Sequence, residues 1–274
     1  NFSAAKAGLK TGFVVRKIDG AEVENLTDAK RKLQGAPGTT LRLSYLDEND
    51  RLQETTLERQ PLAETDKGSV GKGVNFYALF DSKRLADGIG YVQFTNFVSF
   101  LTPRIQAAIE SMKDAPGIIV DLRGNGGGDD DVALAMANMF FERETQLMIT
   151  RTRKGDDFYY KAKAAKNAYR GKIVILLDEL SGSASEQFAA GMQETGRAFV
   201  IGKTSEGEDL DADAIELPNG NLLLYPYGQP RTPKGVVIEG RGVIPNKEVN
   251  LTRAELLAGK DAQLEAAIAY IKGN

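Results

Sequence analysis

Two short segments of this 274-residue chain carry groups that could act on a carbonyl group. The first is Asp121 to Gly128 (DLRGNGGG), in which a short apolar run ends in closely spaced glycines. Glycines let backbone N–H groups converge on an anion because no side chain blocks the approach. The segment lacks the Lys-Ser/Thr pair of a phosphate-binding loop and three aspartates follow it, which disfavours a phosphate ligand. Two interpretations remain open: an oxyanion site, or a tight strand-to-helix turn with an acidic helix start.

The second segment is Ser181 to Glu186 (SGSASE), which lies between the apolar run KIVILL and a predicted helix. A serine at a helix N-terminus lies near the positive end of the helix dipole and beside free backbone N–H groups. This position suits a nucleophile whose carbonyl adduct needs stabilising. The same spacing fits a capping box, with Ser183 as the N-cap and Glu186 returning to it. From the spacing alone, the capping role is favoured over the nucleophile.

A third segment, Thr232 to Pro245 (TPKGVVIEGRGVIP), is glycine-rich and predicts only an ordered turn region. The chain has no cysteine and no histidine. A thiol nucleophile and a thiolate metal site are therefore excluded, and a Ser-His-Asp triad cannot be assembled from these residues alone. Acid–base chemistry must use Lys, Asp, Glu, Tyr or a group outside the chain, and we expect neither a metal nor a cofactor.

The bulk composition is that of a globular protein, with 42% hydrophobic and 27% charged residues. A net charge of −3 and a pI near 5.4 argue against a nucleic-acid partner, because phosphate binding needs a basic surface. No apolar run approaches the roughly 18–20 residues that span a bilayer. The opening residues Asn1 to Ser3 are neither an initiator methionine nor a signal peptide, so the sequence predicts a fragment or mature piece of a longer protein.

Strand and helix patterns alternate from about residue 89 onward, and these elements must position the segments above. Their alternation implies an α/β layer with a largely parallel sheet. Strands are predicted at 89–95, 117–122, 147–152, 172–177 and 198–201, helices at 103–112, 132–141, 183–195 and 261–271, and a hairpin around 218–220.

The front of the chain has a different character. Residues 1–61 form a small β-rich module, with a turn signal at Asp19-Gly20 and a helical pattern from Leu26 to Leu33. Residues 62–88 are polar and glycine-dotted, which predicts a connector with little structure of its own. We therefore expect a front domain at 1–61, the connector at 62–88 and a core domain at 89–274.

Four segments, in this order, resemble the C-terminal-processing (tail-specific) serine proteases and their tricorn-like relatives. They are DLRGNGGG, SGSASEQFAAGMQETGRAFVIGKTSEG, RTPKGVVIEGRGVIPN and GKDAQLEAAIAYI, and the resemblance covers roughly residues 88–272. The earlier stretch AAKAGLKTGFVVRKIDGAEVENLTDAKRKL resembles the later part of a PDZ domain. The resemblance implies a crotonase/ClpP-like α/β protease core with a partial, β-rich PDZ-like domain in front.

The resemblance also implies catalytic roles. Ser183 matches the family's nucleophile, and the backbone N–H groups of Ala184 and Gly127 match its oxyanion hole. Many family members carry a lysine base in a motif like FGKG, and Glu208 stands at that lysine's position here. A carboxylate is a poor base for a serine, and its negative charge opposes formation of the oxyanion. Tricorn-like relatives instead use a histidine upstream of the PDZ-like module, supported by a glutamate that Glu239 matches.

The preferred hypothesis is a serine endopeptidase that forms an acyl-enzyme on Ser183 and takes its general base, a histidine, from outside this chain. Its partners would be loosely folded polypeptides, bound by their C-termini through strand addition, and family resemblance alone suggests a periplasmic or secreted location. One alternative is a catalytically inactive, protease-fold protein that binds peptides or other ligands. Acyl-CoA chemistry on a related fold is a further alternative, but it does not explain the PDZ-like front.

Overall fold

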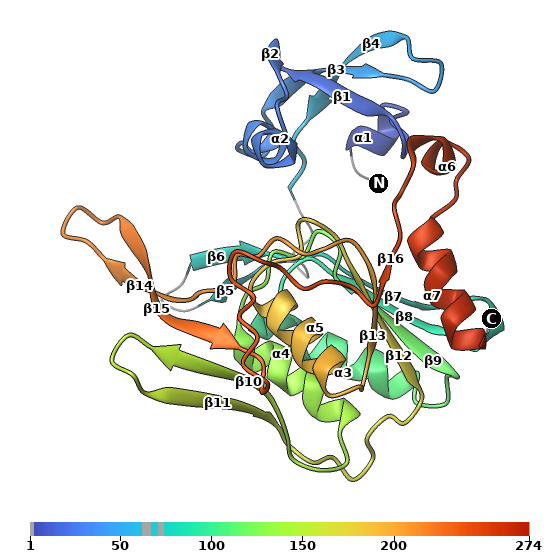
Figure 1. Ribbon diagram of the computed structural model, residues 1–274. Helices are drawn as coiled ribbons and strands as arrows, with labels where there is room; N and C mark the ends of the chain where they lie inside the picture. The colour runs from blue at the N-terminus through green and yellow to red at the C-terminus, as the bar shows by residue number, and fades with distance from the viewer. Residues whose placement is uncertain (1–2, 62–66, 71–73, 274) are drawn as a thin grey trace. The chain divides into compact units, whose positions relative to one another are not determined.

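The computed structural model describes residues 3–61, 67–70 and 74–273. The chain divides into two compact units (Figure 1). The first comprises residues 1–65 and 251–262, and the second comprises residues 66–250 and 263–274. In the described residues, we find no helix that combines the length and the apolar character needed to cross a membrane.

The first unit is built on a four-stranded antiparallel sheet of order β2-β1-β3-β4. Alternating apolar residues of β1 and β3, such as Ile18, Leu41 and Leu43, fill its small core, as expected of strands with one buried face. The strands are β1 (Val14–Ile18), β2 (Ala21–Glu22), β3 (Thr40–Leu46) and β4 (Leu52–Glu58), and the helices are α1 (Ser3–Lys6), α2 (Leu26–Leu33) and α6 (Arg253–Leu257).

Helix α6 belongs to the first unit although it lies late in the chain. The Arg253 guanidinium donates to the carbonyl oxygen of Gly12 at 2.9 Å and to that of Asp47 at 2.6 Å, and it pairs with Asp50. The domain boundaries predicted from the sequence had placed α6 in the core domain, at 89–274. Local pattern could not reveal the contact, because its partners are more than 200 positions away in the chain.

The second unit contains a six-stranded sheet of order β16-β13-β12-β9-β8-β7. Its pairs from β8 to β16 are parallel, and β7 joins β8 in antiparallel fashion. Successive residues of the central strands face opposite layers, so Ile173 and Ile175 pack into one core while Val174 and Leu176 pack into another. The strands are β7 (Phe80–Arg84), β8 (Gly90–Phe94), β9 (Gly117–Asp121), β12 (Lys172–Leu177), β13 (Phe199–Gly202) and β16 (Lys247–Glu248).

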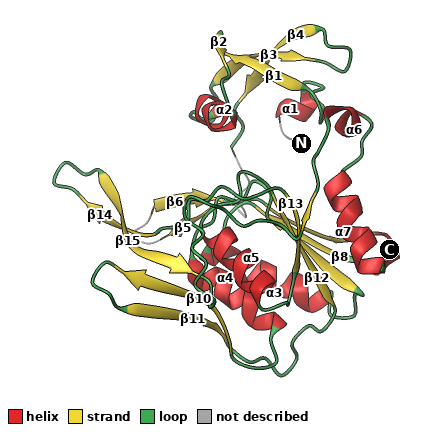
Figure 2. Ribbon diagram, in the orientation of Figure 1, coloured by secondary structure: helices red, strands yellow, loops and turns green. Residues whose placement is uncertain are grey.

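Helices cover both faces of this sheet (Figure 2). The larger core receives side chains of α3 (Thr102–Ser111), α4 (Asp130–Ala137) and α5 (Ala184–Glu194). The smaller core on the opposite face receives those of α7 (Ala262–Lys272). The predicted α/β architecture with a largely parallel sheet is confirmed; the finer crotonase/ClpP-like and PDZ-like assignments stay predictions.

A second sheet of this unit is antiparallel, of order β11-β10-β15-β14. Strands β14 and β15 form the hairpin expected around residues 218–220, and most of its residues are exposed. The strands are β10 (Thr145–Thr152), β11 (Asp157–Ala162), β14 (Asp211–Glu216) and β15 (Leu222–Arg231).

The stretch predicted as an unstructured connector contains strands in the described residues. These are β5 (Lys67–Val70), β6 (Val74–Tyr77) and β7, the last of which forms one edge of the six-stranded sheet. The sequence prediction was wrong there because an edge strand can stay largely polar, as the exposed side chains of β7 are, and so lacks a strong apolar pattern. The rest of that prediction, at 62–66 and 71–73, lies outside the described residues.

Candidate active site

Ser183 occupies a strained backbone position between β12 and α5. Its φ of 50° and ψ of −124° lie in a region that residues other than glycine rarely adopt. Its N–H donates both to the carbonyl oxygen of Glu208 and to the Glu186 carboxylate, each at 3.0 Å. Backbone strain of this kind persists only where the surroundings hold it, and it concentrates at functional sites. Ser183 is therefore both the N-cap of α5 and a candidate nucleophile.

Glu186 has a wider structural role than the predicted cap. Its side chain is fully buried in the first turn of α5. One carboxylate oxygen accepts from the N–H of Gly207 at 2.8 Å and from the hydroxyl of Ser205, and the other accepts from Ser183. Burial raises the pKa of Glu186, and these hydrogen bonds act against that rise. The side chain thus ties the start of α5 to the turn that follows β13.

The glycine-rich turn after β9 runs directly against the candidate nucleophile. Gly127 has a φ of +93°, and a Cβ added there would lie 2.6 Å from the Cβ of Ser183 and 2.9 Å from the N atom of Ala184. Real Cβ atoms essentially never approach so closely, so the turn requires glycine at this position. The structure thus brings together the two segments singled out in the sequence.

The two predicted oxyanion donors differ in their present hydrogen bonding. The N–H of Ala184 lies in the first turn of α5, where an α-helix offers no acceptor to its N–H groups. The N–H of Gly127 donates to Oδ1 of Asn125 at 2.9 Å. Gly127 could therefore serve an oxyanion only by exchanging that partner. The oxyanion roles of Gly127 and Ala184 stay predictions.

Asn125 is a fully buried organiser of the site that sequence reasoning did not single out. Its Nδ2 donates to Phe94 at 2.9 Å, and its carbonyl oxygen accepts from Gly182 and Ser185 at 3.0 Å each. It therefore joins the glycine-rich turn to the loop that carries Ser183. The one signal in the sequence was a large polar residue placed between glycines.

A cleft of about 730 Å³ opens beside Ser183, and we call it the Ser183 cleft. The carboxylates of Asp130, Glu208, Asp211 and Glu239 line it, whereas no lysine or arginine does so among the residues that the structure describes. Strands β14 and β15 add an apolar side to the cleft. The residues of this side are Leu210, which directly precedes β14, and Ala212, Leu224, Pro226 and Tyr227 of the two strands.

Both glutamates predicted from the family pattern line this cleft together with Ser183. Glu239 accepts a hydrogen bond from the N–H of Asp209 at 2.6 Å, which fixes one of its carboxylate oxygens. Glu208 holds the backbone of Ser183 through its carbonyl oxygen. Lys203, the lysine closest in sequence to the position of the family's base, donates instead to Glu248 at 2.9 Å and to Asn250 at 2.5 Å. Lys203 is therefore committed to another contact, away from Ser183.

Two acids of the site, the buried Asp209 and the partly exposed Asp130, were not singled out from the sequence as site residues. Asp209 is fully buried, and neither of its carboxyl oxygens has a hydrogen-bond partner in the described part of the chain. Burial, together with the charges of Glu186, Asp211 and Asp130, raises the pKa of Asp209 to about 9. Burial and the charge of Asp211 raise the pKa of Asp130 to about 8.

The three aspartates at the start of α4 have different roles. Asp129 is the N-cap and accepts from the N–H of Asp131 at 2.9 Å, Asp131 is exposed, and Asp130 faces the Ser183 cleft. Within residues 3–61, 67–70 and 74–273, we find no group of three or more acidic side chains arranged to hold a metal ion. The arrangement as a whole fits attack by a serine on a carbonyl group.

Residues 88–249 match the sequence profile of Peptidase family S41. The chain belongs to this family. It is 30% identical over 253 residues to a probable CtpA-like serine protease of Staphylococcus haemolyticus, covering 90% of this chain and 48% of that protein. It is 26% identical over 278 residues to a carboxyl-terminal-processing protease of Synechocystis, covering 98% of this chain and 62% of that protein. This S41 chain therefore spans about half to three fifths of the length of these two relatives.

Solved structures show the same fold. A photosystem II D1 C-terminal processing protease superposes with a TM-score of 0.65 at 23% identity, over 95% of this S41 chain and 71% of that one. A putative S41 protease from Bacteroides fragilis superposes with a TM-score of 0.68 at 17% identity, over 99% of this chain and 75% of that one. The predicted membership of the C-terminal-processing serine protease family is confirmed by the sequence comparisons and by this shared fold.

Proposed function

We propose that this S41 chain carries the catalytic centre of a serine endopeptidase that cleaves polypeptides through an acyl-enzyme on Ser183. The observation that carries the proposal is the strained Ser183, held at the start of a buried helix with the Gly127 backbone against it and an open cleft beside it. Two relatives are named as a serine protease and a processing protease, and these names support the same reaction class.

In the proposed reaction, the Ser183 hydroxyl oxygen attacks the carbonyl carbon of the scissile bond while a base removes its proton. The oxyanion that forms would accept hydrogen bonds from the N–H groups of Ala184 and Gly127, the latter leaving Asn125. Collapse of this intermediate expels the amine, which takes a proton, and leaves the acyl group on Ser183. A water molecule then attacks the ester carbonyl as Ser183 attacked before, the Ser183 oxygen leaves and regains its proton, and the carboxylic acid product is released.

The proposed general base is a histidine outside these 274 residues, since the chain contains none. Lys203 is committed to Glu248 and Asn250, which supports a base other than a lysine at the family's position. Glu239, whose orientation is fixed by Asp209, would hold the incoming imidazole and stabilise its protonated form. Glu208, at the lysine position, would contribute negative potential rather than proton transfer.

The proposal extends to assignments beyond the family itself. The core would have the crotonase/ClpP-like arrangement and belong to the tricorn-like branch, and the first unit would be part of a PDZ domain. That unit would present polypeptide C-termini by adding them as a strand to its sheet. A periplasmic or secreted location follows from the family resemblance.

A second candidate is a catalytically inactive relative that binds polypeptides in the same cleft. Two observations favour it: Glu208 stands in place of the family's lysine, and the Gly127 N–H is already bound to Asn125. Family membership shows the fold and reaction class, whereas activity belongs to the particular residues of the site.

The two candidates differ in their effect on an unfolded polypeptide. A protein long enough to include the sequence before this chain should cut reduced, unfolded casein into fragments visible on a gel, and the Ser183→Ala variant should cut none. Circular dichroism would verify that both proteins are folded. Casein left intact by the folded wild type would support the binding protein instead.

A further inference from the structure

The hairpin of β14 and β15 exposes many apolar side chains, and we call its residues 210–227 the arm (Figure 1). Seven of the fifteen large apolar side chains that are exposed in the described chain belong to the arm. They are Leu210, Ile215, Leu222, Leu223, Leu224, Tyr225 and Tyr227. Single apolar residues scattered over a surface are ordinary, whereas a cluster of this kind marks a contact surface.

The arm has little support from its own sheet. Strand β10 pairs with residues 228–231 of β15, which lie beyond the arm, and β14 is an edge strand. Within the described chain, the two strands of the arm therefore pair with each other and with no further strand. A two-stranded ribbon is only marginally stable in water, so apolar side chains along it gain from a partner that covers them.

The pairing register divides the arm into two faces. Residues directly opposite each other in a ribbon share a face, and so do alternate residues of one strand. One face, which we call the cleft face, consists of Ala212, Ala214, Glu216, Leu222, Leu224 and Pro226. The opposite face consists of Asp213, Ile215, Leu223 and Tyr225.

The cleft face continues the Ser183 cleft, and the opposite face does not. Ala212, Leu224 and Pro226 line that cleft together with Ser183, whereas no residue of the opposite face is among its described lining residues. Leu222 carries the apolar surface further out. The strand advances four residues from Pro226 to Leu222, which is about 13 Å at about 3.3 Å per residue. One apolar surface thus leads away from the candidate nucleophile.

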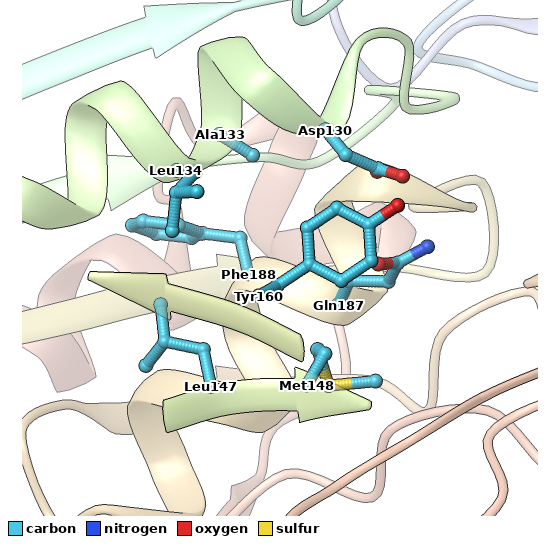
Figure 3. Close-up of a pocket in the computed structure, with 8 residues that line it drawn as sticks. All are labelled: Asp130, Ala133, Leu134, Leu147, Met148, Tyr160, Gln187 and Phe188. Atoms are coloured by element: carbon cyan, nitrogen blue, oxygen red, sulfur yellow. The ribbon is translucent and has the colours of Figure 1, made fainter. Parts of the chain in front are cut away.

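The root of the arm is fixed to the helix that begins at Ser183. Asp211 is the first residue of β14, and its Oδ1 accepts from Nε2 of Gln187 in α5 at 2.9 Å while its Oδ2 accepts from the hydroxyl of Thr150 at 2.6 Å. The polar ends of Gln187 and Asp130 lie on the same side in Figure 3, and Asp130 also lines the Ser183 cleft. Asp211 therefore holds the start of the arm in place beside the nucleophile.

The partner that fits this surface best is an extended polypeptide. A chain that lies in the cleft at Ser183 can continue along the cleft face, and every second side chain of an extended chain points to the same side. We propose that the cleft face of the arm binds apolar side chains at alternate positions of the polypeptide, several residues from the bond that Ser183 attacks. The proposal deepens the proposed peptidase function and rests on it for that bond, but the binding itself requires no chemistry at Ser183.

The test compares two peptides of the same composition. Both are polar except for two leucines, which are separated by one residue in the first peptide and adjacent in the second, so that only the first presents both leucines on one side of an extended chain. Binding to the folded Ser183→Ala variant of the longer protein is measured by fluorescence anisotropy, so that no peptide is consumed. We expect the first peptide to bind about tenfold more tightly, a difference of about 1.4 kcal/mol.

Two adjacent leucines supply a matched pair of arm variants. Leu224→Ser on the cleft face and Leu223→Ser on the opposite face remove the same side chain from positions that are 70% and 44% exposed, so both variants should fold. Leu224→Ser should remove the preference for the first peptide, and Leu223→Ser should keep it. Leu222→Ser, further along the cleft face, should reduce the preference.

Equal binding of the two peptides, or equal losses in Leu223→Ser and Leu224→Ser, would overturn the proposal. A second copy of this chain is the other occupant, and sedimentation tests it: an oligomer that only Leu224→Ser splits into monomers would overturn the proposal as well. Cleavage by the protein with Ser183 intact is scored separately. A peptide preference without Ser183-dependent cleavage would contradict the peptidase proposal alone, whereas cleavage without the preference would contradict the role of the arm alone.

Discussion

At the residue scale, Ser183 and Gly127 define each other's position. Both adopt positive φ values, 50° and +93°, and the backbone of Gly127 passes within contact of the serine side chain. The family resemblance placed Gly127 and Ala184 in one oxyanion hole beside Ser183, whereas the local patterns indicated each segment separately. Contact between residues far apart in the chain depends on how β9 and β12 pair in parallel, which local spacing does not encode.

Gly127→Ala should nearly abolish reactivity at Ser183. The added methyl group would lie 2.6 Å from the Ser183 Cβ and 2.9 Å from the Ala184 N atom, so one of these must move. Displacement of about 1 Å at a catalytic group can reduce the rate by about 100-fold. The rate of fluorophosphonate labelling measures the effect. Gly126→Ala is the matched control, because its Cβ would meet no atom within 4 Å, and equal loss in both variants would contradict the account.

Asp209→Asn should stabilise the protein, and increasingly so as pH rises. Burial raises the pKa of Asp209 to about 9, from about 3.9 in an unfolded chain. Between these pH values the folded state binds the extra proton, so the free energy of unfolding falls as pH rises. The asparagine has no proton to lose, and its melting temperature should exceed that of the wild type by several degrees more at pH 8 than at pH 4. Asp131→Asn should show no such difference, and an equal gain at both pH values would refute the argument.

At the element scale, α5 is fixed to the turn after β13 through one buried side chain. Glu186 accepts hydrogen bonds from Ser183, Ser205 and Gly207, so three segments depend on it. The sequence predicted its contact with Ser183 through the capping-box spacing. Its contacts with Ser205 and Gly207 were not predictable, because they require the parallel pairing of β12 and β13.

Glu186→Gln should lower both stability and reactivity. An amide presents one acceptor oxygen in place of two, so at least one of the three donors faces an NH₂ group and loses its hydrogen bond. A buried polar group left unsatisfied costs about 1–3 kcal/mol. Thermal melting and the labelling rate of Ser183 measure the two effects. Glu265→Gln, on the exposed side of α7, should match the wild type; a Glu186 variant that also did so would show that the network is dispensable.

Elements with strong apolar patterns were the predictable part of the fold. The run KIVILL is buried on both faces in β12, and GIIVDL forms β9 and the residue after it, because central parallel strands need such runs. Strands β5 to β7 were missed, since all three are short strands at sheet edges and only β6 has a largely apolar sequence. The family resemblance identified Ser183, Glu208 and Glu239, which all line the cleft, but the burial of Asp209 beside them emerged only from packing.

At the scale of the whole molecule, the net charge of −3 understates the local field at the site. Carboxyl groups gather in the Ser183 cleft, and walls of low dielectric strengthen their potential.

The central claim is that Ser183 is an activated nucleophile, and active-site labelling tests it most directly. The longer protein, which includes the sequence before this chain, is treated with a fluorophosphonate, and the modified residue is located by mass spectrometry. We predict a single label on Ser183 in the wild type and none in folded Ser183→Ala. Absence of label from Ser183 in the folded wild type would contradict the account and leave Ser183 as the cap of helix α5 in a polypeptide-binding protein.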